Sequence, residues 1–199
     1  MTIGHADGLV TLDLDEADPA HRERVRLEMG EAYRTLLGHL RHEIGHFYWP
    51  VLVGADRIDA WRALFGDERV DYSEAMERHY RSGPPQDWAE SHVSAYATMH
   101  PWEDWAETFA HYLHIRDTLQ TAASFGMVVA GPAPHLYAEP ADDVVGRPFG
   151  AVIREWLPLT YALNAVNRSM GRPDLYPFVL APRVIDKLTF VHRAVGPPP

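Results

Sequence analysis

The chain has 199 residues, 46% of them hydrophobic and 11% aromatic, which is enough to build a substantial buried core. We therefore expect a single domain over residues 1–199. The formal net charge of -10, without any run rich in Lys or Arg, argues against nucleic acid and membrane surfaces as partners. The chain has no cysteine, so disulfides, iron–sulfur clusters and thiolate zinc sites are excluded, and a transition metal would need His, Asp or Glu ligands.

The N-terminal stretch carries acidic residues where a signal peptide needs a basic region and an apolar core. No apolar run in the sequence approaches membrane-spanning length, and we therefore expect a cytoplasmic protein. Alternation of apolar and polar residues over 8–14 predicts a short strand. Asp18-Pro19 then predicts a helix that has proline as its first residue.

Apolar residues spaced three and four apart predict a helix over about 31–53. Its buried face is expected to consist of Leu36, Leu37, Leu40, Ile44 and Phe47. Two shorter helices are expected over 56–65 and 72–80, and the turn cluster SGPPQD follows them.

Pro101 predicts the first residue of a long helix that ends near Gly126, with Glu103 and Asp104 complementing the helix dipole in its first turn. A loop rich in Pro and Gly is expected over 131–150. Two more helices should follow over roughly 149–170 and 181–194, the first with one face formed by Trp156, Leu159, Leu163 and Val166. The fold class is thus α+β, mainly α with a small β element.

The motif HEIGH, residues 42–46, lies on the first long helix. Residues four apart share a helix face, so the imidazoles of His42 and His46 can converge on one ion while Glu43 lies beside it. This HExxH pattern is typical of zinc hydrolases, in which the glutamate takes a proton from a metal-activated water. Gly45 is unfavourable inside a helix, which indicates that another part of the chain comes close there.

A third ligand must come from elsewhere in the chain. Trp49 and Leu52 occupy the positions at which the longer metzincin motif has glycine and histidine, so that class is rejected. Glu103 and Glu107 are four apart on the predicted second long helix, with His111 one turn further along. We prefer Glu103 as the ligand, whereas Glu107 either replaces it or supports a ligand histidine through its other ring nitrogen. His111 is a lesser candidate for the same two roles.

HEIGH followed by YATMHPWEDWAE resembles the gluzincin class of zinc metallopeptidases, and in particular the bacterial "putative zinc-binding metallopeptidase" family. The resemblance covers most of the chain and implies a zincin-like catalytic domain with an HExxH helix and a second, Glu-bearing helix. It also implies one zinc ion per chain and a peptide or protein substrate. In several gluzincins a catalytic tyrosine stands seven residues before the ligand glutamate, and Tyr96 has that spacing from Glu103. By similarity, Tyr96 would hydrogen-bond the oxyanion of the tetrahedral intermediate.

Two other functions fit part of this pattern. Glu43-x-x-His46 is also half of the signature of helical di-iron carboxylate oxidoreductases, but the second half is missing. A catalytically silent module that binds a metal or a peptide would have the same fold and ligands, although it would have no need of Glu43. We therefore expect a zinc-dependent hydrolase, in particular a metallopeptidase with Glu43 as general base.

Overall fold

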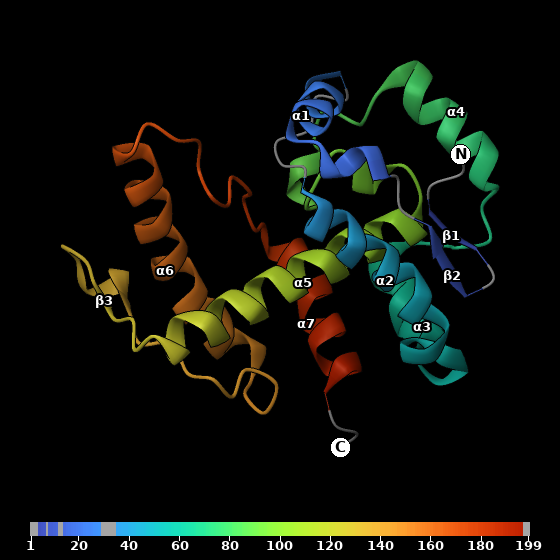
Figure 1. Ribbon diagram of the computed structural model, residues 1–199. Helices are drawn as coiled ribbons and strands as arrows, with labels where there is room; N and C mark the ends of the chain where they lie inside the picture. The colour runs from blue at the N-terminus through green and yellow to red at the C-terminus, as the bar shows by residue number, and fades with distance from the viewer. Residues whose placement is uncertain (1–3, 7, 12–13, 29–34, 197–199) are drawn as a thin grey trace. The chain divides into compact units, whose positions relative to one another are not determined.

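The computed structural model describes residues 4–6, 8–11, 14–28 and 35–196, and the protein is mainly helical (Figure 1). Seven α-helices occur in these residues, with two small antiparallel hairpins. Contacts within the chain group residues 1–111 and 178–194 into a first compact unit and residues 112–177 and 195–199 into a second. The expectation of a single domain stays a prediction.

The first unit begins with a hairpin in which β1 (Gly4–Ala6) pairs antiparallel with β2 (Leu9–Thr11). Strand β2 lies within the predicted strand over 8–14, of which residues 12 and 13 are outside the described residues, whereas β1 was not predicted. A 3-10 turn (Leu14–Ala17) leads into α1 (Pro19–Glu28), so the predicted helix start at Pro19 is confirmed. Both strands contact α2 (Leu36–Leu52).

Helix α2 begins after Thr35, whose side chain accepts a hydrogen bond from the Gly38 amide as an N-cap. The predicted start near residue 31 falls outside the described residues. The predicted buried face is wrong, because Leu36, Leu37 and Phe47 are 37%, 52% and 39% exposed. The buried residues of α2 are instead His42, Glu43 and Gly45. The helix buries a polar face because that face meets α5 (Pro101–Ser124).

Helices α2 and α5 approach each other closely at Gly45. A Cβ atom at this position would lie 3.1 Å from the Cα of Ala106 and 3.2 Å from the Cβ of Phe109. The indole N–H of Trp105 donates a hydrogen bond of 2.8 Å to the Gly45 carbonyl. The sequence expectation of a close approach at Gly45 is therefore confirmed, and it explains why a helix interior accepts glycine.

The predicted short helices are α3 (Gly54–Phe65) and α4 (Tyr72–Ser82). Trp61 and Phe65 of α3 stack on one another, and Phe65 packs edge-on against Trp105. Helix α7 (Pro182–Val195) joins this unit through Lys187, which donates hydrogen bonds of 2.6 Å to Asp104 and to the Ser91 carbonyl. This buried ion pair fixes α7 to the start of α5.

The second unit contains the end of α5, the hairpin of β3 (Val129–Ala130) and β4 (Tyr137–Ala138), and α6 (Phe149–Ser169). The predicted ends of α5 and α6 are confirmed within two residues, but β4 lies inside a stretch expected to be a loop. Trp156 and Leu159 are buried as predicted, whereas Val166 is 60% exposed. The last turns of α6 bury Asn164 instead, whose side-chain amide bonds both the N–H and the carbonyl of Tyr176.

In the described part of the chain, no helix is long and apolar enough to cross a membrane. The cytoplasmic location stays a prediction.

We expect Gly45→Ala to destabilise the protein, although alanine is intrinsically better than glycine in a helix by about 1 kcal/mol. The added methyl group would press on the backbone of α5, and overpacking of this kind costs about 1–3 kcal/mol. The matched control is Gly150→Ala in α6, where the added Cβ would meet only the Arg154 guanidinium at 3.8 Å. Urea unfolding should show a lower free energy of unfolding for Gly45→Ala and no loss for Gly150→Ala. Equal stability of the two variants would contradict the close contact.

Candidate metal centre

Three buried or half-buried side chains from two helices meet at one point in the first unit. His42 and His46 lie one turn apart on α2, and their Nε2 atoms are 3.1 Å from each other. Glu103, in the first turn of α5, places Oε2 at 3.0 Å from Nε2 of His42 and Oε1 at 3.4 Å from Nε2 of His46. Among the described residues, these three form the group whose ligand atoms lie close enough to hold a metal ion.

The donor atoms and their separations fit zinc. Zinc–ligand distances of about 2.0–2.1 Å in a tetrahedral site place the ligand atoms roughly 3.3 Å from one another. Imidazole nitrogen and carboxylate oxygen are both common zinc ligands. Nε2 of His42 faces both Nε2 of His46 and Oε2 of Glu103, and one ring nitrogen cannot accept a hydrogen bond from the first and donate one to the second at the same time. A cation between them would satisfy both lone pairs and the carboxylate together.

Glu107 lies on the other side of the His42 ring. The Nδ1–H group of His42 donates to Oε1 of Glu107 at 2.8 Å, and Ser94 donates to the second oxygen of Glu107 at 2.7 Å. With a metal ion in place of the Nε2 proton, this hydrogen bond would hold the His42 ring with Nε2 pointing at the ion. The geometry thus places Glu103, rather than Glu107, in the group, and gives Glu107 the supporting contact that was the alternative.

Hydrogen bonds and ion pairs among these groups determine which of them are charged. Burial alone would lower the pKa of His42, but hydrogen bonds to Glu103 and Glu107 raise it to about 10. Burial would likewise raise the pKa of Glu107, but the hydrogen bond from His42 lowers it to about 2. His42 and His46 keep the pKa of Glu103 below its ordinary value against the effect of burial. Both acids are therefore carboxylates at neutral pH, as a ligand and a ligand support must be.

Tyr96 and Tyr72 approach the same group from different elements. Tyr96 begins the 3-10 turn Tyr96–Thr98 just before α5, and its ring centre lies 6.1 Å from that of His42. Burial and the nearby Glu103 raise the pKa of Tyr96, so its phenol stays protonated and can donate. Tyr72 of α4 donates a hydrogen bond of 2.9 Å to Oε1 of Glu103. Sequence reasoning missed Tyr72, because its distance of 31 residues from Glu103 has no fixed relation to the motif.

Glu43 is buried beside the histidines, with 5% of its surface exposed. Burial would raise its pKa, but a hydrogen bond from His39 and the nearby His42 and His46 lower it. Its Oε1 atom lies 3.2 Å from Nε2 of His39. Its Oε2 atom is buried and has no hydrogen-bond partner in the described part of the chain. Glu43 thus has one oxygen held and one oxygen available to take a proton.

His111 lies outside the metal-binding group. It is buried, and its ring packs edge-on against Phe178 at 4.4 Å between ring centres. Burial lowers its pKa to about 4, although the nearby Glu107 opposes this shift. A neutral histidine packed in this way fits a core position near Glu107 better than a ligand position.

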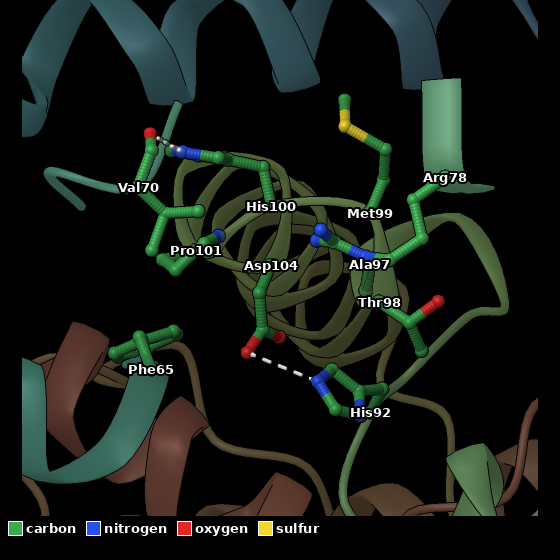
Figure 2. Close-up of a pocket in the computed structure, with 10 residues that line it drawn as sticks. All are labelled: Phe65, Val70, Arg78, His92, Ala97, Thr98, Met99, His100, Pro101 and Asp104. Atoms are coloured by element: carbon green, nitrogen blue, oxygen red, sulfur yellow. Dashed lines mark hydrogen bonds and ion pairs between the residues drawn. The ribbon is translucent and has the colours of Figure 1, made fainter. Parts of the chain in front are cut away.

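A separate small cavity of about 190 Å³ lies beside the start of α5. Figure 2 shows Asp104 and His92 facing each other in its lining, where His92 Nε2 is 3.7 Å from the Asp104 carboxylate. The cavity is lined by Phe65, Val70, Met99, Arg78, His92 and Asp104, among others, and by none of the three metal-binding residues.

Residues 1–194 match the family described as "Putative zinc-binding metallo-peptidase". The chain belongs to this family. The resemblance inferred from HEIGH and YATMHPWEDWAE is thereby confirmed at the level of the family. The chain is also 54% identical over 197 residues to uncharacterised proteins of Mycobacterium bovis and Mycobacterium tuberculosis, a match that covers 98% of this chain and 56% of each relative. It therefore spans just over half the length of these relatives. No solved structure matches the chain.

Exchange of each acid for its amide separates the roles of Glu103 and Glu107. Loss of an outer hydrogen-bond partner of a ligand weakens metal binding by about 10- to 100-fold, and we expect this for Glu107→Gln. Glu103→Gln should weaken zinc binding well beyond this range, because it removes a charged ligand. Competition with a chromophoric chelator measures both affinities, and Glu77→Gln on the exposed side of α4 is the control. The reverse order of the two affinities would make Glu107 the ligand.

Proposed function

We propose that this protein is a zinc-dependent hydrolase, and specifically a metallopeptidase that cleaves peptide bonds in a peptide or protein substrate. The observation that carries the proposal is the group formed by His42, His46 and Glu103, in which one ligand atom from each residue lies within 4.8 Å of the other two. The family to which the chain belongs supports zinc as the metal and a peptide bond as the target. We propose one zinc ion per chain, because the described residues contain one such group.

A zinc ion in this group would lower the pKa of a coordinated water and polarise the carbonyl of a substrate. Glu43 is the proposed general base. Its Oε2 atom is buried without a partner among the described residues, and a hydrogen bond with the water would satisfy it. Glu43 accepts a proton from the attacking water and then gives it to the departing amine, so that one carboxylate serves both steps.

The other residues prepare the site for this proton transfer. Tyr96 is the proposed donor to the oxygen of the former carbonyl, where negative charge develops. Glu107 keeps His42 in the required tautomer, and Tyr72 limits rotation of the Glu103 carboxylate through its hydrogen bond to Oε1. All seven side chains that have a role in this proposal belong to the first unit.

The di-iron alternative is disfavoured by the position of Glu107. A di-iron site needs carboxylates that reach both ions, but Glu107 faces Nδ1 of His42, on the far side of the ring from the ligand atoms. The silent binding module is disfavoured by Glu43. A protein that only binds has no use for a buried carboxylate oxygen without a partner, which costs free energy.

We expect zinc-loaded protein to cleave unstructured peptides and to contain one zinc per chain by elemental analysis. Glu43→Gln should retain the zinc but lower kcat by about 100- to 10,000-fold, because proton transfer is lost. Release of amino groups from a peptide library measures the rate. A variant that lacks Glu43 and keeps full activity would rule out this mechanism.

Tyr96→Phe tests the oxyanion contact independently. Loss of one donor to the oxyanion lowers kcat by about 100- to 1,000-fold, and we expect KM to change little. Tyr80→Phe is the matched control, since Tyr80 is an exposed tyrosine on α4. Equal kcat values for Tyr96→Phe and the control would exclude Tyr96 from catalysis.

A further inference from the structure

A line of three side chains runs from the N-terminal segment to the proposed general base. His39 lies one turn before Glu43 on α2, with Nε2 at 3.2 Å from Oε1 of Glu43. Its other ring nitrogen, Nδ1, lies 2.7 Å from Oε2 of Glu16. Glu16 belongs to the 3-10 turn before α1, far from the HEIGH motif in the sequence. None of the contacts of His39 in this line involves a metal-binding residue.

The line is buried along its length. Glu16 is 2% exposed, and the side chain of His39 is 16% exposed. A buried carboxylate costs free energy unless it is paired, and the imidazole of His39 contacts both acids. The hydrogen bond to Glu43, opposed by burial and reinforced by Glu16, raises the pKa of His39. The ring thus presents N–H groups that hold both carboxylates.

The contact with His39 determines the orientation of the Glu43 carboxylate. Because His39 holds Oε1, the carboxylate cannot rotate freely, and Oε2 is left as the oxygen without a partner in the described residues. Gly4 of the hairpin lies beside this oxygen, since a Cβ atom at that position would lie 3.9 Å from Oε2. A residue without a side chain therefore flanks the oxygen that is to meet the water.

We infer that Glu16 and His39 are positioning residues for Glu43: Glu16 orients the His39 ring, and His39 holds one oxygen of Glu43 so that the other accepts the proton. This inference rests on the proposed function, since it gives Glu43 the role of general base. Contacts that only anchored the N-terminal segment to α2 would contribute to stability but not to the turnover rate. Variants that differ by one hydrogen bond distinguish these roles.

The chain allows matched variants at both positions. His39→Gln keeps an N–H group near the place of Nε2, whereas His39→Leu removes both ring nitrogens. Glu16→Gln keeps an oxygen that accepts from Nδ1, whereas Glu16→Ala removes it. His21→Leu on α1 is the control, because His21 contacts Arg24 and lies outside the line.

We expect kcat for peptide cleavage to fall by about 10- to 100-fold in His39→Leu and Glu16→Ala, as for other outer partners of a site. His39→Gln and Glu16→Gln should stay within about threefold of the unmodified protein, with KM and zinc affinity unchanged in all four variants. Adding Glu16→Ala to His39→Leu should lower kcat no further, because both changes break the same line. Independent losses in the double variant, or unchanged kcat in His39→Leu, would overturn the inference.

A second measurement needs no substrate. In zinc-loaded protein with ¹⁵N-labelled histidine, Glu43→Gln should shift the Nε2 resonance of His39, and Glu16→Ala should shift Nδ1. If neither resonance moves, the line does not exist and the inference fails. If the unmodified protein cleaves no peptide while both resonances move, the proposed function fails but the contacts to Glu43 stand.

Discussion

The close approach of α2 to α5 at Gly45 is the constraint on which the rest of the site depends. The two imidazoles of α2 reach the carboxylate of α5 where the two backbones come close together, and a side chain at position 45 would press on the α5 backbone. The Trp105 indole locks the contact by bonding the Gly45 carbonyl. His42 and His46 lie on either side of Gly45 in the sequence, and Glu103 lies just before the contacting residue Ala106. The ligand positions thus follow directly from one helix contact.

Around this contact, each buried acidic side chain named below lies against a histidine or a lysine. His42 lies between Glu103 and Glu107, His39 lies between Glu16 and Glu43, and Lys187 pairs with Asp104. The acids in these pairs each contact an imidazole or an ammonium group that holds the carboxylate in one orientation, as the proposed proton transfer requires before substrate arrives. Trp61 and Trp105 both pack against Phe65 in the same unit.

Sequence reasoning named His42, His46 and Glu103, which the structure brings together as a group that could hold a metal ion, because their relation is local or chemically required. Helical periodicity alone places His42 and His46 on one face, and Glu103 lies on the next acidic helix. The buried face of α2 was predicted wrongly, because an apolar stripe normally marks the core, whereas here the polar face meets α5. Sequence reasoning missed Tyr72, Glu16 and the partner strand β1. Their positions depend on how separate elements pack, and no fixed spacing in the sequence relates them to the HEIGH motif.

The central claim is that one zinc ion is bound by two imidazoles of α2 and the Glu103 carboxylate. X-ray absorption of the zinc-loaded protein, together with a crystal structure of the same sample, tests it most directly. The account predicts zinc with two nitrogen ligands and at least one oxygen ligand at about 2.0–2.1 Å, assigned to His42, His46 and Glu103. A protein that cannot be loaded with zinc, or a zinc ion bound by other residues, would contradict it.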